Sequence, residues 1–291
     1  LSAIYSVELS RGGSEFLFVR KHLIAFGIGF AMMLVAANSN YLLLRSYGRV
    51  LYIAGVVMMI GVLLFGTELN GTTGWFIFFG LSFQPVEYMK LALAVQLARY
   101  FGEHARRRFG WREIIGSGLL TAIPTGLTML QPDLGSAVLL VGMWLIVMFF
   151  AGLRTQHIIT LLISGLIVGV FAWGFFLQDY QRERLRVFLN PALDPLESGY
   201  NITQAKIAIG SGEIFGRGLG FGSQSQLKFL PESQTDFIFA VIAEELGFLG
   251  VLMVLSAFVL LLWRMISIAF HARDNFTSFL SIAIFAIIFV C

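Results

Sequence analysis

The sequence has a single cysteine, Cys291, in a chain of 291 residues. One thiol cannot form a disulfide within the chain, and it cannot supply the several ligands that a cysteine-held metal cluster needs. Charge is also scarce, since Asp, Glu, Lys and Arg together make up only 13% of the residues. Typical soluble domains carry about 25%. The scarcity of charge therefore excludes a water-soluble globular protein.

Apolar residues take the place of the missing charges. Hydrophobic residue types make up 57% of the chain, and aromatic residues make up 14%. A chain of this composition must turn much of its apolar surface toward lipid. We therefore expect an all-α, polytopic integral membrane protein, a helical bundle that forms a single membrane domain over residues 1–291.

Long apolar runs bounded by polar, proline or glycine residues define the predicted spans, each near the ~20 residues that a helix needs to cross a bilayer. The runs are 22–36, 50–66, 84–101, 114–130, 135–152, 157–178, about 236–263 and 275–291. We expect about eight complete spans with terminal fragments. The residues that follow Leu1 resemble the tail of a further span, and the last run stops at Cys291 in mid-stretch.

Arginines in alternate loops predict the orientation of these spans. The richer set of loops holds Arg45, Arg49, Arg106, Arg107, Arg108, Arg112, Arg154, Arg264 and Arg273, whereas the other short loops hold only Arg11, Arg20 and Lys21. The richer set is expected to be cytoplasmic by the positive-inside rule. The net charge of +3 thus reports membrane orientation, and no nucleic-acid partner is expected.

This orientation places residues 67–83, 131–134 and 179–235 on the outer side. The last segment is a large extracytoplasmic loop in which we expect interfacial helices, because "NITQAKIAIG" spaces its apolar residues as an amphipathic helix does, with Lys206 among them. Arg182, Arg184 and Arg186 alternate near its start, and glycines are dense from Gly210 to Gly222. Glycine lets a backbone approach a ligand or headgroup closely, and arginine binds phosphate. A solvated stretch with turn glycines explains the pattern equally well.

Ionisable residues within the spans gather near the outer side. Glu87 and Lys90 lie on the first turns of the span that follows the loop 67–83, Asp133 lies in a tight turn between two spans, and Asp236 begins the span after the large loop. An ionisable group in hydrocarbon costs about 3 kcal/mol or more, so such residues normally face a polar cavity, a partner charge or a ligand. A structural explanation is a buried Glu87–Lys90 pair with Asp133 as a helix cap. The convergence of three separate hairpins at one depth favours a site.

Four blocks of sequence carry a resemblance to a known family. They are "QPVEYMK" (Gln84 to Lys90), "QPDLGSA" (Gln131 to Ala137), "DPLESGYNITQAKIAIGSG" (Asp194 to Gly212) and "LPESQTDFIFAVIAEELGFLG" (Leu230 to Gly250). In this order and spacing they closely resemble the SEDS family of shape, elongation, division and sporulation proteins. The resemblance runs along essentially the whole chain. The stretch "QSQLKFLPE" is more similar to the rod-elongation branch of the family than to its division branch.

The resemblance implies a peptidoglycan glycosyltransferase that polymerises lipid II at the outer leaflet of the bacterial cytoplasmic (inner) membrane, for cell-wall elongation and cell shape. Family members have ten spans and work with a class B penicillin-binding protein, which crosslinks the new glycan. We therefore expect a multi-pass membrane protein with lipid II as substrate and such a protein as partner.

The resemblance also implies roles for individual residues. The essential aspartate of the family falls on Asp236, in a block that also contains Glu232, and the other conserved residues fall on Gln84, Glu87, Lys90 and Asp133. Three positions depart from the family pattern: Gln234 stands in place of histidine, Val86 in place of serine, and Gly74 in place of an arginine. These departures leave the roles of the neighbours of Asp236 open.

Glycan extension needs a base for the acceptor hydroxyl and positive charge for the leaving diphosphate. We expect Asp236 to act as that base, or to hold the hydroxyl and a divalent cation, Mg²⁺ or Mn²⁺. Lys90, with Arg186 and Lys206 of the outer loop, is expected to bind the diphosphate, and Glu87 to orient Lys90.

Two further acids follow Asp236 in the same predicted helix. Glu244 lies about 80° around a helix from Asp236 and is expected to line the same cavity, whereas Glu245 lies opposite. One of the two is therefore expected to make a packing or headgroup contact, and we assign a catalytic role to neither.

Three alternatives stay open at this point. A lipid II flippase would also need a polar cavity, but its site is expected near the midplane and open to both sides. A scaffold that only recruits the penicillin-binding protein would need no catalytic aspartate. A division-type member of the same family would perform the same chemistry in another complex.

Overall fold

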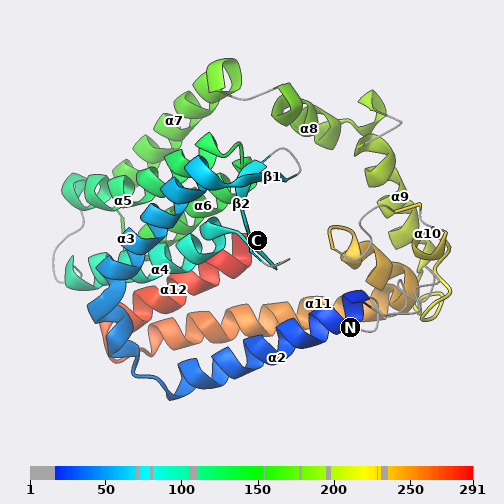
Figure 1. Ribbon diagram of the computed structural model, residues 1–291, viewed down its shortest axis with the longest axis horizontal. Coiled ribbons are helices and arrows are strands. Elements are labelled where there is room, and N and C mark those ends of the chain that lie inside the picture. Colours follow the sequence, from blue (N-terminus) through cyan, green and yellow to red (C-terminus); the bar gives the residue numbers. More distant parts are fainter. Residues whose placement is uncertain are drawn as a thin grey trace. The chain divides into compact units, whose positions relative to one another are not determined.

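The computed structural model describes residues 17–69, 72–78, 81–104, 110–153, 155–176, 179–194, 198–227, 229–230 and 235–290 (Figure 1). The chain divides into two compact units. The core unit comprises Asn40–Val170 and Leu260–Cys291, and the loop unit comprises Leu1–Ser39 and Phe171–Val259. The prediction of one membrane domain over residues 1–291 stays a prediction.

The core unit consists of helices and a small sheet. Its elements are α3 (Tyr41–Phe65), β1 (Thr67–Leu69), β2 (Thr72–Phe78), β3 (Leu81–Phe83), α4 (Pro85–His104), α5 (Trp111–Leu130), α6 (Leu134–Phe150), α7 (Thr155–Phe171), the last part of α11 (Ile238–Phe270) and α12 (Asn275–Val290). The loop unit holds α2 (Leu17–Asn38), a π-helical turn (Ala172–Phe176), α8 (Asp179–Leu189), a 3₁₀ turn (Pro191–Leu193), α9 (Ser198–Ser211), α10 (Ser223–Gln226) and the first part of α11.

The eight predicted spans correspond to α2, α3, α4, α5, α6, α7, α11 and α12, and the all-α, polytopic membrane fold is confirmed. By length and composition, five of these helices can cross a membrane: α2, α3, α5, α7 with its π-helical turn, and α11. Helices α6 and α12 are apolar but shorter. Helix α4 is the most charged of the eight, because it carries an ion pair near each end.

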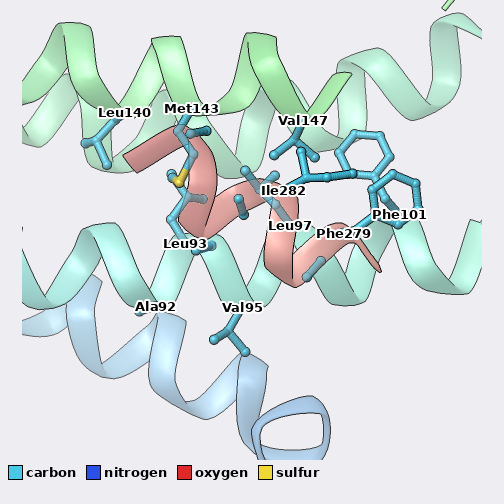
Figure 2. Packing of buried hydrophobic residues seen from close by; sticks show 14 of the residues in the cluster. Ala92, Leu93, Val95, Leu97, Phe101, Leu140, Met143, Val147, Phe279 and Ile282 are labelled. Carbon is cyan, nitrogen blue, oxygen red and sulfur yellow. The ribbon is translucent and has the colours of Figure 1, made fainter. Parts of the chain in front are cut away.

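Helix α4 forms the centre of the core unit, and every residue from Ala92 to Ala98 is buried. Its apolar side chains pack against α3, α6 and α12 (Figure 2). Small residues let these helices approach closely, as is usual in membrane bundles. At Gly102, for example, an added Cβ would lie 3.2 Å from the backbone of Phe276 in α12. Because residues on all sides of this stretch are buried, packing fixes the middle of α4, whereas Leu91 nearer its start is 57% exposed.

A proline in α5 creates a second link within this unit. Pro124 has no N–H, so the carbonyl of Leu120 four residues earlier loses its helical donor. The hydroxyl of Tyr52 on α3 donates to that carbonyl at 2.7 Å. In an apolar environment an unpaired carbonyl is costly. Tyr52 therefore both satisfies Leu120 and ties α3 to α5.

The predicted outer loop 67–83 contains a feature that the sequence did not lead us to expect. Strands β1, β2 and β3 form an antiparallel sheet in the order β1-β2-β3. Thr67 pairs with Trp75 and Phe76 with Phe83. The last strand ends at Phe83, so only Gln84 separates the sheet from the first turn of α4.

Candidate functional site

The first half of the predicted site lies at the N-terminal end of α4. Pro85 is the first residue of α4. Proline is well tolerated there, because an N–H at this position would have no acceptor within the helix. The Nζ atom of Lys90 lies 2.7 Å from Oε1 of Glu87. The Lys90 side chain is only 8% exposed, whereas the Glu87 side chain is 59% exposed. The Lys90 side chain is thus almost fully buried, and its ammonium is held by the partly exposed carboxylate of Glu87. The predicted contact is confirmed.

Asp133 connects α6 to this end of α4. Its Oδ1 accepts a hydrogen bond from the Ser136 N–H at 3.0 Å, which makes it the N-cap of α6. Its Oδ2 accepts from Nε2 of Gln84 at 3.3 Å. The capping role considered from the sequence is confirmed. Gln84, Glu87, Lys90 and Asp133 therefore belong to one end of the core unit, and Gln84 and Asp133 are in direct contact.

Gln131 and Gly74 lie at the same end of the core unit, although neither was among the predicted site residues. Gln131 is 1% exposed, and its Nε2 has no hydrogen-bond partner among the described residues. A Cβ at Gly74 of β2 would lie 3.2 Å from Oε1 of Gln131 and 3.7 Å from Nε2 of Gln84. Strand β2 therefore lies against both amides. The signal was present, because Gln131 begins the block "QPDLGSA" and Gly74 was noted as a departure.

The second half of the predicted site lies in the loop unit. Asp236 is exposed in the turn that precedes α11. Arg186 on α8 is exposed, and its Nη1 lies 3.9 Å from Oε2 of Glu183, which is a weak ion pair. Lys206 on α9 is exposed and forms no ion pair within the part of the chain that the structure describes. Glu232 lies outside the described residues.

The glycine-rich segment 212–222 packs on the first turns of α11 through its backbone. Arg217 and Gly218 donate N–H groups to the carbonyls of Glu244 and Glu245 at 2.9 and 3.0 Å. In the reverse direction, Phe248 and Leu249 donate to the carbonyls of Glu213 and Ile214 at 2.9 and 3.1 Å. These four bonds lock the loop to the helix.

Glycine is needed for this fit. Gly216 and Gly247 have φ of 79° and 64°, a region that side chains rarely allow. A Cβ on Gly212 would collide with the carbonyl of Ala243, and one on Gly216 with the carbonyl of Glu245. The sequence left two explanations open for these glycines, close approach of a ligand or headgroup and turns in a solvated stretch. In the structure they admit the chain's own helix.

Two buried acids complete this contact. Glu244 is fully buried and accepts hydrogen bonds from the Gln224 N–H at 2.8 Å and the Ser223 hydroxyl at 3.4 Å. Glu245 accepts from the Gly220 N–H at 3.3 Å. Glu244 was expected to line a cavity with Asp236, and this was wrong. The helical angle does not apply, because Asp236 precedes the helix, which begins at Ile238.

The described residues contain no group of three or more His, Cys, Asp or Glu side chains arranged to hold a metal ion. The carboxylates of Glu87 and Asp133 are already engaged by Lys90 and by Ser136 with Gln84. Of the predicted acids that the structure describes, Asp236 is the exposed one that remains. One or two carboxylates are enough where substrate phosphates supply the other ligands, so the exposed carboxylate of Asp236 is chemically suited to a cation that arrives with a diphosphate.

Comparison with known proteins identifies relatives that match nearly the full length of this chain. The family model described as a cell cycle protein, FtsW/RodA/SpoVE, matches residues 1–291. Peptidoglycan glycosyltransferase MrdB of Escherichia coli (strain K12) is 35% identical over 294 residues, which cover 99% of this chain and 78% of MrdB. Probable peptidoglycan glycosyltransferase FtsW of Thiomicrospira cyclica is 36% identical over 274 residues, covering 92% of this chain and 69% of that protein.

Solved structures agree with these relatives. A chain from a peptidoglycan synthase complex, described in terms of coordinated polymerization and crosslinking, matches with a TM-score of 0.77 and 29% identity, covering 98% of this chain and 81% of that chain. The rod shape determining protein RodA of Thermus thermophilus matches with a TM-score of 0.67 and 27% identity, covering 98% of this chain and 76% of RodA.

Proposed function

Because the chain belongs to the FtsW/RodA/SpoVE family of cell cycle proteins, we propose that it is a peptidoglycan glycosyltransferase that polymerises lipid II into glycan strands. The observation that carries the proposal is its 35% identity, over 99% of the chain, to a protein named peptidoglycan glycosyltransferase. Its multi-pass helical architecture fits a lipid-linked substrate. The reaction takes place at the outer face of the bacterial cytoplasmic membrane.

The reaction joins an acceptor sugar hydroxyl to the anomeric carbon of the lipid-diphosphate donor. One carbon–oxygen bond forms, the bond from that carbon to the diphosphate breaks, and the hydroxyl proton must leave. Asp236 accepts this proton, and its exposed position before α11 leaves the carboxylate accessible to a substrate.

Lys90 stabilises the negative charge that develops on the departing diphosphate. A preorganised cation is effective in this role because it needs no rearrangement when the charge appears. The 2.7 Å contact with Glu87 fixes the ammonium, and burial of the lysine stem limits its movement. Glu87 is thus a positioning residue. Gln84 and Asp133 contribute polar atoms beside it.

The remaining predicted residues and the cation have supporting roles. Arg186 and Lys206 offer exposed positive charge to the lipid diphosphate, and Glu232 lies in the same block as Asp236. A Mg²⁺ or Mn²⁺ ion would be held by the substrate diphosphate together with Asp236 and would neutralise phosphate charge there.

A class B penicillin-binding protein is the proposed partner. The similar chain in the synthase complex belongs to an assembly described as combining polymerization with crosslinking, and glycan strands must be crosslinked to form a wall. Cell-wall elongation is the proposed process, because the stretch "QSQLKFLPE" is more similar to the rod-elongation branch of the family than to the division branch. The division branch is the alternative, since FtsW is similar to the same extent as MrdB.

The test is polymerisation of fluorescent lipid II by the purified chain with its partner. We expect Asp236→Asn to reduce strand formation by about 100-fold or more, the size of effect seen when a key reacting or charge-stabilising group is removed. Glu213→Gln is the matched control, because Glu213 is also an exposed acid of the loop unit and has no proposed role. Addition of a chelator tests the cation.

Two outcomes would contradict the proposal. Full strand formation by Asp236→Asn would favour a scaffold. Lipid II scrambling without strand formation by the unaltered protein would favour a flippase. The position of charge on α4 supports the enzyme, because between Lys90 and Arg99 the helix carries no ionisable residue that a midplane transport site would use.

A further inference from the structure

Two cavities lie at the end of the core unit opposite to Lys90, where α11 ends and α12 begins. The first has a volume of about 530 Å³, and its polar lining comprises Tyr41, Arg264, Ser267, His271, Arg273 and Thr277. The second has a volume of about 500 Å³ and shares Arg273 with the first. The positive-inside rule predicts that this arginine-rich end is cytoplasmic. Nothing in the glycosyl transfer described above uses either cavity.

The first cavity is positively charged and contains no acidic side chain. Neither Arg264 nor Arg273 forms an ion pair or hydrogen bond with another residue in the described ranges, and both are exposed. His271 is fixed by a 2.8 Å contact between its Nδ1 and the carbonyl of Ser267. Ser267 adds a hydroxyl group to the lining, whereas the hydroxyl oxygen of Thr277 is buried. Guanidinium, imidazole and hydroxyl donors together are the set that recognises phosphate oxygens.

The carboxylates that share the second cavity with Arg273 are Glu103 and Asp274, and both are engaged. Nε of Arg99 lies 3.0 Å from Oε1 of Glu103. Asp274 lines the second cavity rather than the first. Its Oδ2 accepts from the Tyr41 hydroxyl at 3.2 Å, and its Oδ1 from the Thr277 N–H at 2.6 Å. Arg45 lines the same second cavity and is its electrostatic partner. The two arginines of the first cavity are therefore left to an external anion.

We propose that the first cavity binds the phosphate headgroup of an anionic phospholipid from the cytoplasmic leaflet. Arginine pockets between helices on that side of a membrane suit such headgroups. The lining is partly apolar, because it includes Ile268, which is 43% exposed. Trp263 and Phe270, the sequence neighbours of the lining residues Arg264 and His271, are 67% and 73% exposed and offer apolar surface to acyl chains. A water-soluble phosphate would gain nothing from these flanks, which is why we commit to a lipid.

The bound lipid would join three helices. Tyr41 begins α3, Arg264 lies on α11, and Thr277 lies in the first turn of α12. A single headgroup in this cavity therefore contacts an element from each of three sequence regions of the core unit. The expected consequence is stabilisation of this end of the unit by anionic lipid, independent of lipid II.

The test measures retention of phosphatidylglycerol by the full chain. The protein is reconstituted in phosphatidylcholine nanodiscs with a small fraction of phosphatidylglycerol, released into detergent, and examined by native mass spectrometry. We expect Arg264→Gln and Arg273→Gln each to weaken apparent phosphatidylglycerol binding about fivefold. Arg264→Lys retains the charge and should lose less. Arg49→Gln is the matched control, because Arg49 is exposed on α3 near the same end but lines neither cavity.

Three results would overturn the proposal. An equal loss in Arg49→Gln would show a diffuse charge effect rather than a site. Retention unchanged in the double variant Arg264→Gln/Arg273→Gln would show that the cavity binds no anionic lipid. Full displacement of phosphatidylglycerol by millimolar glycerol phosphate would show a site for soluble phosphates. Thermal unfolding in phosphatidylcholine alone checks that each variant is folded.

Discussion

Lys90 in the core unit and the acidic segment after Asp236 in the loop unit are positioned by different kinds of interaction. The position of Lys90 is set by the apolar packing of α4 against α3, α6 and α12. The position of the acidic segment is set by four backbone hydrogen bonds to the glycine loop and by the carboxylate contacts of Glu244 and Glu245 with that loop. The surroundings of Lys90 therefore depend on side-chain volume, whereas the segment after Asp236 depends on the absence of side chains in the glycine loop.

The difference predicts how each half tolerates change. A packed core accepts volume-conserving substitutions at a cost below about 1.5 kcal/mol. A backbone-to-backbone contact accepts no Cβ where glycine is required, because the colliding atom belongs to the main chain and cannot rotate away. Substitutions in each region should therefore distinguish effects on the glycosyl transfer from effects on the stability of the fold.

The largest expected effect is on activity, in Lys90→Met. Methionine fills a similar buried volume without charge, so the fold should persist while the leaving diphosphate loses its cation. We expect strand formation from lipid II to fall about 100- to 1,000-fold. The control is Arg99→Met, which removes the partner of Glu103 at the other end of the same helix, where the ion pair is 3.0 Å long, and it should stay within about twofold. Equal losses would show that charge on α4 serves folding.

Gly216→Ala tests the loop unit. The new Cβ collides with the carbonyl of Glu245, and φ at this position is 79°. A cost of about 1–3 kcal/mol is expected. Hydrogen exchange should increase in the glycine loop and in the first turns of α11, while the core around α4 stays protected. Gly210→Ala is the control, because no atom lies within 4 Å of its added Cβ and alanine favours a helix. Uniform loss of protection in both units would contradict the separation.

Tyr52→Phe probes a polar link inside the packed unit. It leaves the carbonyl of Leu120 without a donor, since Pro124 has no N–H to give. The expected loss is about 1–2 kcal/mol in the free energy of unfolding. Tyr88→Phe is the matched control: its hydroxyl donates to the carbonyl of Leu51 at 3.2 Å, but that carbonyl keeps its own helical donor in α3. A larger effect of Tyr88→Phe would refute the role of the proline.

The smallest expected effect concerns Asp274, at the predicted cytoplasmic end. Burial alone raises the pKa of Asp274, but hydrogen bonds from Thr277 and Tyr41 and the nearby charge of Arg45 outweigh it, so the pKa lies below its ordinary value. The stability that this group contributes is present above its unfolded pKa, about 3.9, and is lost as the pH falls through the lower folded pKa.

Tyr41→Phe should therefore reduce the free energy of unfolding by a few tenths of a kcal/mol at pH 7, and by less at pH 3. Thermal unfolding of both proteins at the two pH values measures the difference. A destabilisation that grows on acidification would contradict the sign of this argument.

Much of the fold could be predicted because lipid imposes one simple requirement on the sequence. Each apolar run of sufficient length became a helix, within a few residues at most boundaries. The largest difference is at the start of α3, which begins at Tyr41 rather than at residue 50. The predicted span began after Arg45 and Arg49 because these charges interrupt the apolar run. Long basic side chains near a helix end can extend toward water, so they do not end the helix. The helix begins earlier, where the side chain of Asn40 caps it.

The site was less accessible to sequence reasoning. The Glu87–Lys90 contact and the Asp133 cap are local, so spacing was enough to predict them. The burial of Glu244 depends on a loop about 20 residues earlier in the chain, and the position of Gly74 beside Gln131 depends on a sheet with weak pattern. Contacts between distant segments leave no periodic signal, and that is where the predictions failed.

The break at Gly247 has a geometric consequence for α11. The 33 residues of this helix would extend about 50 Å if straight, well beyond the ~30 Å of a hydrocarbon core. Only the part after Gly247, about 35 Å long, needs to match that thickness. The glycine loop binds on both sides of the break, to the carbonyls of Glu244 and Glu245 before it and to the N–H groups of Phe248 and Leu249 after it. The loop therefore fixes the angle at which the short part meets the membrane-spanning part of the helix.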